Sequence, residues 1–303
     1  MLRRGATLRG LRRQEELTAW LFVAPVVLGI LIFSVYPVLF SLYISLTDWN
    51  VLTAPRWIGP QNYAELVTTD RFFMTALANS AVYAAGTVVP GLVLALFFAV
   101  LLNQDIRGRF VYRAIYFVPV VAPTVSIAIL WTWIYEPTFG VLNYALKQVG
   151  IEGPPWINSS AWAMPSLIFM TIWHGLGYSI VILLAGLQTI PREYYEAASI
   201  DGANALHRFR HVTLPLLSPV TFFVLVLSVI NALQAFTSAY VLTGGGPANA
   251  TLTVVLYLYQ LAFQFEYMGL ASAVAYCLFV IIIVLTGLNF ALQRLWVFYD
   301  EGR

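Results

Sequence analysis

The chain has 303 residues, of which 60% are hydrophobic and only 10% are charged. An average soluble domain is about half apolar and a quarter charged, and a domain of this size has too little interior to bury the excess apolar surface. The composition therefore excludes an ordinary soluble enzyme, a disordered chain and a secreted disulfide scaffold. Cys277 is the one cysteine, so neither an internal disulfide nor a cysteine metal cluster can form. The formal net charge of +2 gives no reason to expect a nucleic-acid partner.

Six long stretches contain no Asp, Glu, Lys or Arg, and each is long enough to cross a bilayer. A hydrocarbon core about 30 Å thick needs roughly 20 apolar residues in a helix, and a helix satisfies its own backbone hydrogen bonds in lipid. We therefore expect an all-α membrane protein with spans at about 19–45, 73–102, 114–134, 162–187, 216–241 and 268–291.

Basic residues are unevenly distributed between the predicted loops. Arg56, Arg71 and Lys147 lie on one side, and the other 13 of the 16 lie on the opposite side. Basic residues gather on the cytoplasmic side of a membrane, so both termini are expected in the cytoplasm. The cytoplasmic group consists of Arg3, Arg4, Arg9, Arg12, Arg13, Arg107, Arg109, Arg113, Arg192, Arg208, Arg210, Arg294 and Arg303.

The chain is expected to form one membrane domain. Residues 1–16 form a basic cytoplasmic tail, and residues 17–303 form the membrane domain. Residues 1–45 do not read as a cleaved signal peptide, because their apolar run is too long. The predicted outer loops are 46–72, 135–161 and 242–267, and the longest inner loop is 188–215.

Several chemical functions lack the residues that they require. The one lysine, Lys147, has no glycine-rich loop before it, so the chain cannot itself be a P-loop ATPase. None of the spans carries an acidic or basic residue near its centre, which argues against an ion-coupled carrier. No nucleophile, base and orienting group occur together. The chain is therefore expected to be non-catalytic, and any transport energy must come from another protein.

The polar inner loop 188–215 predicts two short helices. The first covers 192–200, Gly202 ends it and leaves room for the helices to approach closely, and the second covers about 204–212. Leu214 and Pro215 mark the return to the membrane. A helix-turn-helix at the inner surface could dock in a groove of a partner protein.

This loop resembles the permease subunits of binding-protein-dependent ABC importers, whose pattern is EAA-x3-G-x9-I-x-LP. Glu196, Ala197 and Ala198 are followed at the family's spacing by Gly202 and by Leu214-Pro215, with Val212 in place of isoleucine. The resemblance implies a type I ABC importer permease fold with its core at about 73–291. It also implies that the loop couples the chain to an ATPase. The implied coupling residues are Glu196, Ala197, Ala198, Asp201, Gly202, Leu214 and Pro215.

Other segments resemble the carbohydrate branch of this family. They are Gly59-Pro60-Gln61-Asn62-Tyr63, Arg113 with Pro119, Tyr240 to Pro247, Ala262-Phe263 and Met268 to Ala273. The resemblance implies a bacterial or archaeal plasma-membrane subunit that imports a neutral sugar or oligosaccharide. Its partners would be a second homologous permease, two ATPase subunits that bind ATP and Mg²⁺, an extracytoplasmic sugar-binding protein and membrane lipid. The chain itself would hold no cofactor.

Polar residues inside two spans are candidates for the sugar path. Asn231, Gln234 and Ser238 are spaced i, i+3 and i+7, which places them on one face of a continuous helix. In the fourth span the candidates are Trp173, His174, Gly175 and Tyr178, and Gly175 and Gly177 would allow close helix approach. The alternative interpretation is hydrogen bonding and packing between helices.

Three other functions stay open from the residues alone. They are a glycerol-3-phosphate-type ABC permease, an ion-coupled secondary carrier and a structural subunit of a membrane complex. A phosphorylated solute would favour basic residues along the path, and none lies at mid-membrane. A neighbouring gene set with an ATPase and a binding protein would favour an importer over a secondary carrier.

Overall fold

The structure is a computed structural model that describes residues 8–104 and 108–298. Within these residues, five helices are long and apolar enough to cross a membrane, and two helices joined at a bend bring the number to six. These segments overlap the predicted spans. They are α1 (Leu8–Ile30), η1 (Leu31–Val35) and α2 (Tyr36–Ser45); α4 (Arg71–Leu102); α5 (Arg109–Val121) with α6 (Thr124–Ile134); α8 (Ser160–Thr189); α10 (Ala205–Arg208), η3 (Phe209–Thr213) and α11 (Leu214–Leu233); and α14 (Met268–Leu292).

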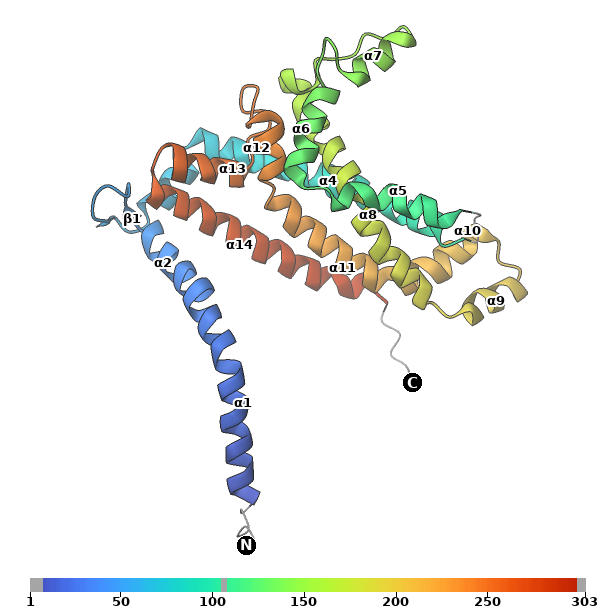
Figure 1. Ribbon diagram of the computed structural model, residues 1–303, viewed down its shortest axis with the longest axis horizontal. Helices are drawn as coiled ribbons and strands as arrows, with labels where there is room; N and C mark the ends of the chain where they lie inside the picture. Colours follow the sequence, from blue (N-terminus) through green and yellow to red (C-terminus); the bar gives the residue numbers. More distant parts are fainter. Residues whose placement is uncertain (1–7, 105–107, 299–303) are drawn as a thin grey trace.

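Shorter elements connect the long helices. β1 (Thr47–Asp48) pairs antiparallel with β2 (Arg56–Trp57), and this hairpin lies near the first residues of α14 (Figure 1). We call the end of the molecule that carries this hairpin the hairpin end. The opposite end, where α9 (Arg192–Ile200) and α10 lie, is the elbow end. The remaining elements are α3 (Gln61–Thr68), α7 (Val141–Gln148), η2 (Trp156–Asn158), α9 (Arg192–Ile200), α12 (Thr237–Thr243), α13 (Val254–Tyr259), η4 (Gln260–Gln264) and η5 (Gln293–Leu295).

The core is built on α4, α8 and α11, which pack through small residues. Ala95 and Ala99 of α4 are fully buried. A Cβ added at Gly86 would lie 2.6 Å from Ile168 Cδ1, and one added at Gly186 would lie 2.8 Å from Val220 Cγ2. Membrane helices have no hydrophobic force between them in lipid, so close packing of small residues holds them together.

The first span leaves this bundle. In Figure 1, α1 extends away from the other long helices. The most apolar stretch of Thr18–Ser45 has no buried residue, whereas Ile44 and Ser45 at its end are buried. Phe22 is 74% exposed and Phe33 is 81% exposed. Apolar surface of this extent needs lipid or another protein to cover it.

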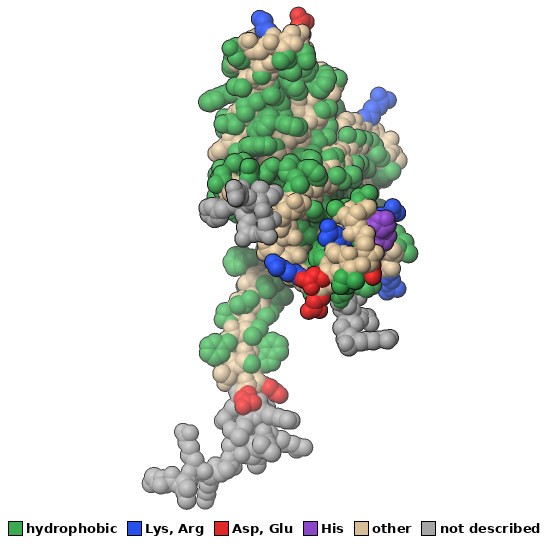
Figure 2. Space-filling model, turned by 90° about the vertical axis from the view of Figure 1, so that its right-hand side faces the viewer, with side chains coloured by type: hydrophobic (Ala, Val, Ile, Leu, Met, Phe, Trp, Pro, Cys, Tyr) green, Lys and Arg blue, Asp and Glu red, His purple; other side chains and the backbone are tan. Residues whose placement is uncertain are grey.

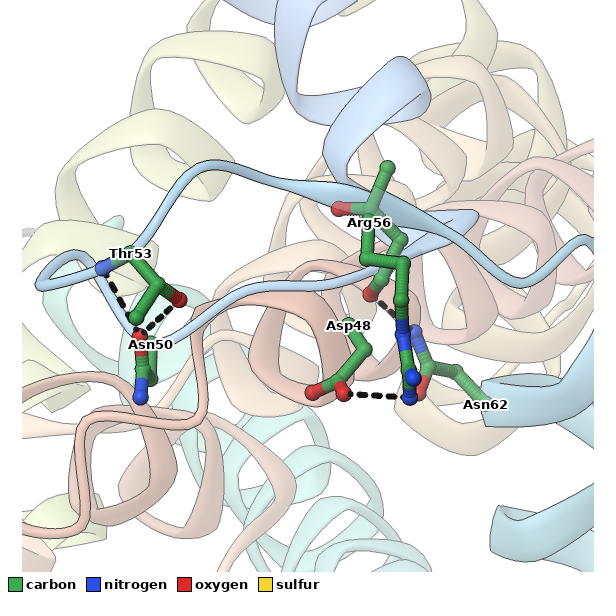
Figure 3. Close-up of polar contacts among 6 residues, drawn as sticks. Asp48, Asn50, Thr53, Arg56 and Asn62 are labelled. Carbon is green, nitrogen blue, oxygen red and sulfur yellow. Dashed lines mark hydrogen bonds and ion pairs between the residues drawn. The ribbon is translucent and has the colours of Figure 1, made fainter.

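The end of α2 is held by the hairpin and by α3. The Asn62 side-chain amide donates to the carbonyl oxygens of Ser45 and Thr47, both at 2.9 Å. Figure 3 draws Asn62 together with the exposed ion pair of Arg56 and Asp48, whose charged atoms are 3.1 Å apart. Asn62 is buried, so its two hydrogen bonds fix the chain direction where the first span ends.

Charged side chains gather at the elbow end. Figure 2 views the molecule from that side. Exposed Arg, Asp, Glu and His side chains lie together there, below a mainly hydrophobic region in this view. This agrees with the predicted polar inner loop. Arg3, Arg4, Arg107 and Arg303 of the predicted cytoplasmic group lie outside the described residues, as do residues 1–7 of the predicted tail.

Two predicted spans are not single straight helices. α5 and α6 meet at 106°, at Ala122 and Pro123. The fifth span does not continue to residue 241, because α11 ends at Leu233 and α12 begins only at Thr237. The break is stabilised from outside: Thr253 Oγ1 donates to the carbonyl oxygen of Ala235 at 2.9 Å.

The predicted outer loop 242–267 is also more ordered than expected. It contains α13 and η4, and Val254 and Leu256 are fully buried. Two α4 side chains hold the segment: Ser80 Oγ accepts from the Val254 backbone at 2.9 Å, and Asn79 Nδ2 donates to the Asn249 carbonyl at 2.7 Å. These bonds satisfy backbone groups that a buried irregular segment would otherwise leave unpaired.

Candidate functional site

A cavity of about 450 Å³ lies among α4, α8 and α11, near the middle of α8. Apolar side chains form part of its wall, and none of the described residues that line it is Asp, Glu, Lys or Arg. Hydroxyl, amide and imidazole groups can donate to and accept from the hydroxyls of an uncharged polar solute. The polar lining residues are Tyr83, Thr87, Thr124, Thr171, His174, Tyr178, Ser179, Ser228 and Asn231.

His174 lies at the bend between α5 and α6. Its Nε2 is 3.2 Å from the carbonyl oxygen of Ala122, directly before Pro123. A carbonyl oxygen only accepts, so Nε2 carries a hydrogen and donates it in this contact. The imidazole thus satisfies a carbonyl that the bend removes from helical pairing, and it forms part of the cavity wall.

The other predicted α8 residues separate into two groups. Gly175 and Tyr178 line the cavity, and Tyr178 is half exposed. Trp173 does not line it, because its ring packs edge-on against Trp131 with centroids 5.5 Å apart. The expectation of close approach holds for Gly177 alone: its added Cβ would lie 2.1 Å from the Tyr116 carbonyl oxygen, whereas nothing lies within 4 Å at Gly175.

The prediction that three polar residues share one face of the fifth span is wrong. Asn231 lines the cavity, but Gln234 follows the last residue of α11 and Ser238 is buried in α12. The three residues cannot share one helix face because the helix ends between them.

The α4 wall of the cavity is absent from the predicted site. The Tyr83 hydroxyl donates to Thr171 Oγ1 at 3.0 Å, and Thr87 Oγ1 donates to the Tyr83 carbonyl at 2.7 Å. Tyr83, Thr87 and Gly91 all line the cavity and are spaced at i, i+4 and i+8. That spacing within an apolar span is a signal in the sequence that could have identified them.

At the elbow end, the chain forms the predicted helix-turn-helix. We define the elbow as residues 192–213, which comprise α9, a turn at Gly202, and α10 with η3. Asn204 caps the second helix by accepting from the His207 backbone at 2.9 Å. The second helix continues into α11, so Ala205–Leu233 is one uninterrupted helical run from the elbow to the cavity.

Two side-chain hydrogen bonds join the halves of the elbow. Arg208 Nη1 donates to Ser199 Oγ at 3.1 Å, and the hydroxyls of Tyr195 and Thr213 are 3.1 Å apart. Both bonds connect α9 to the second helix. The elbow can therefore move as one body with the helical run to which it is joined.

The residues of the predicted coupling motif occupy this elbow and the start of α11. Glu196, Ala197, Asp201 and Gly202 are exposed and Ala198 is half-buried, whereas Leu214 and Pro215 are half-buried in the first turn of α11. The expectation that Gly202 makes room for close helix packing is wrong, because nothing lies within 4 Å of an added Cβ. Its φ of +78° favours glycine instead.

Apolar helices around a polar cavity, with an elbow continuous with one of them, define a membrane permease. The solved structure of a bacterial ABC transporter involved in the import of the acidic polysaccharide alginate contains a similar chain. The TM-score is 0.82 at 23% identity, over 94% of this chain and 97% of that one. This likeness confirms the type I ABC importer permease fold.

Residues 91–297 match the family described as the binding-protein-dependent transport system inner membrane component, and the chain belongs to that family. It is 39% identical to the probable ABC transporter permease protein YesP of Bacillus subtilis, over 95% of this chain and 94% of that protein. It is 33% identical to the trehalose/maltose transport system permease protein MalF of Thermococcus litoralis, over 91% and 93%. It is 36% identical to the lactose transport system permease protein LacF of Rhizobium radiobacter, over 94% and 96%.

These findings confirm the predicted class. The chain is a multi-pass membrane permease subunit and a transport component, not an enzyme.

Proposed function

We propose that this permease moves a neutral sugar or oligosaccharide across the membrane through the cavity beside α8. The observation that carries the proposal is the wall chemistry: hydroxyl, amide and imidazole groups line a cavity of about 450 Å³, and no Asp, Glu, Lys or Arg among the described residues lines it. The names of the trehalose/maltose and lactose relatives support the same class of solute. A glycerol-3-phosphate-type solute would need cationic groups to offset its phosphate.

The elbow would transmit the energy of ATP hydrolysis. In this proposal it sits in the cytoplasm and docks against an ATPase subunit that holds ATP and Mg²⁺, with both termini of the chain on the same side. Because the elbow and α11 are one helical run, a displacement of the elbow would move the cavity wall at Ser228 and Asn231. ATP binding would open the cavity outward, and hydrolysis would reset it inward.

Other subunits would complete the transporter. A second homologous permease would close the open side of the cavity and cover part of the exposed first span, and two ATPase subunits would engage the elbows. An extracytoplasmic sugar-binding protein would deliver the solute at the hairpin end. A solved relative of similar fold is described in complex with a periplasmic protein that holds an alginate pentasaccharide, which supports this arrangement.

The test uses the assembled transporter in proteoliposomes, with sugar uptake and ATP hydrolysis measured together. Glu196→Gln should lower the amount of sugar imported per ATP by roughly tenfold, the factor that corresponds to about 1.4 kcal/mol. Glu193→Gln is the matched control, because Glu193 is also an exposed carboxylate on α9. Equal uptake per ATP in both variants would refute the coupling role.

The solute class is tested separately with the same vesicles. Neutral oligosaccharides should compete with the imported sugar, whereas a phosphorylated or uronic-acid analogue of similar size should not. Preferential uptake of the anionic analogue would refute the proposed solute class.

A further inference from the structure

The last described residues of the chain fold back onto the start of α11. We call residues 293–298 the strap; it comprises η5 and the three residues that follow η5. The backbone N–H of Phe298 donates to Ser218 Oγ at 2.8 Å. The strap is thereby fastened to a residue 80 positions earlier in the chain, only three residues after Pro215 of the coupling motif.

Ser218 makes a second hydrogen bond, which satisfies a backbone carbonyl in the first turn of α11. Its hydroxyl donates to the Pro215 carbonyl oxygen at 2.6 Å. In a regular helix that carbonyl would accept from the backbone N–H of residue 219, but Pro219 has none. Ser218 is 3% exposed, so water cannot replace either bond easily. One buried hydroxyl thus completes the first turn of α11 and holds the strap.

Aromatic contacts reinforce the same junction. Phe222, one turn after Ser218, packs edge-on against Phe290 of α14 with centroids 5.2 Å apart. It also packs edge-on against Trp296 of the strap at 6.0 Å. Edge-to-face aromatic pairs are directional as well as attractive. The strap is therefore held by both a hydrogen bond and ring packing.

We propose that Ser218 and the strap are positioning elements that make α11 and α14 move together when the elbow is displaced. This inference rests on the proposed coupling function. α11 carries the elbow and lines the cavity, whereas α14 packs against α2 and the hairpin. The strap would pass the elbow's motion to the side of the molecule that carries the first span.

Two variants break the junction from opposite sides. Ser218→Ala removes the hydroxyl, and truncation after Leu295 removes Trp296 and Phe298. Each should lower sugar uptake per ATP about fivefold, the effect of one lost hydrogen bond in the coupled state. Both variants remove the Phe298–Ser218 bond, but only Ser218→Ala removes the bond to Pro215 and only truncation removes the Trp296 ring. The loss in the double variant should therefore be smaller than the sum of the two single losses. Ser218→Thr keeps the hydroxyl and should restore uptake, and Leu295→Ala, an 80% exposed strap residue, is the control.

Each outcome has a defined meaning. Losses that add in full in the double variant, or unchanged uptake per ATP after truncation, would overturn the role of the strap. Thermal unfolding of each assembled complex identifies a variant that has only lost stability. If the unmodified complex imports no sugar, the proposed function fails; if Glu196→Gln uncouples transport but truncation does not, only the strap proposal fails.

Discussion

The Cβ that Gly269 lacks would lie 2.0 Å from the carbonyl oxygen of Thr47. The backbone of the hairpin therefore packs directly against the backbone at the start of α14. The Gly269 N–H also donates to the Trp49 carbonyl oxygen at 3.2 Å. The same Thr47 carbonyl accepts from Asn62 at 2.9 Å. Two separate sequence motifs, 59–63 and 268–273, thus converge on one carbonyl and fix the end of an otherwise exposed first span.

Gly269→Ala should destabilise this junction. Overpacking a tight contact costs about 1–3 kcal/mol, and here the opposing atom is a backbone oxygen that cannot rotate away. We expect a lower midpoint of thermal unfolding for the purified protein in detergent. Gly287→Ala in the same helix is the control, because nothing lies within 4 Å of its added Cβ. Equal destabilisation by both substitutions would contradict the backbone contact.

The spans and the elbow could be predicted because their signals are local. Charge-free runs of sufficient length identify the spans, and Gly202 separates two short polar helices. The break at Gln234–Phe236 could not be predicted in this way, since it contains neither glycine nor proline. Its Ala235 carbonyl is satisfied by Thr253, a partner that only the tertiary fold brings near.

Part of the cavity could be predicted because some of its residues lie close together in the sequence. His174, Gly175 and Tyr178 follow one another closely in one span and all line it. Tyr83 and Thr87 lie about 90 residues earlier, and their contribution depends on α4 packing beside α8. Trp173 shows the opposite error: its position in the sequence is close to the cavity residues, but its ring packs on Trp131.

Gly175 and Gly177 should respond differently to the same substitution. Gly177→Ala places a methyl group 2.1 Å from the Tyr116 carbonyl oxygen, so α5 and α8 must separate and unfolding should occur at lower temperature. Gly175→Ala meets nothing within 4 Å and should keep wild-type stability. A larger side chain, Gly175→Leu, should lower sugar uptake by filling the cavity. Normal uptake by a stable Gly175→Leu protein would show that solute does not pass this wall.

Gly202→Ala tests whether the turn of the elbow depends on its left-handed backbone. An L-residue at φ +78° raises the energy of the folded backbone by roughly 1–2 kcal/mol, although no atom lies within 4 Å of its Cβ. We expect faster hydrogen exchange over 192–213 and weaker coupling of ATP hydrolysis to uptake. The exchange rate and coupling of Gly202→Asn should lie between those of Gly202→Ala and the unmodified protein, since asparagine tolerates this backbone region better than alanine. Identical exchange in Gly202→Ala and the unmodified protein would exclude the backbone explanation.

Tyr257 links α13 to the start of α4, and its bond predicts a dependence of stability on alkaline pH. Its hydroxyl donates to Asp70 Oδ2 at 2.6 Å. Burial, followed by the bond to the Asp70 carboxylate, raises the pKa of Tyr257 above its ordinary value of about 10. The unfolded chain therefore ionises first as pH rises. The stability that this bond contributes is complete below about pH 10 and is lost as pH climbs towards the folded pKa.

Tyr257→Phe should lower the free energy of unfolding at pH 8 by about 1.5–3 kcal/mol, the range for a hydrogen bond to a charged group. Above pH 10 the variant should lose stability less steeply than the unmodified protein, because it lacks the phenol that ionises. Thermal unfolding between pH 7 and pH 11 measures both effects. Tyr144→Phe, which alters a phenol that is 66% exposed on α7, provides the control and should leave the whole pH profile unchanged. Parallel pH profiles for Tyr257→Phe and the unmodified protein would mean that this phenol does not set the alkaline limit.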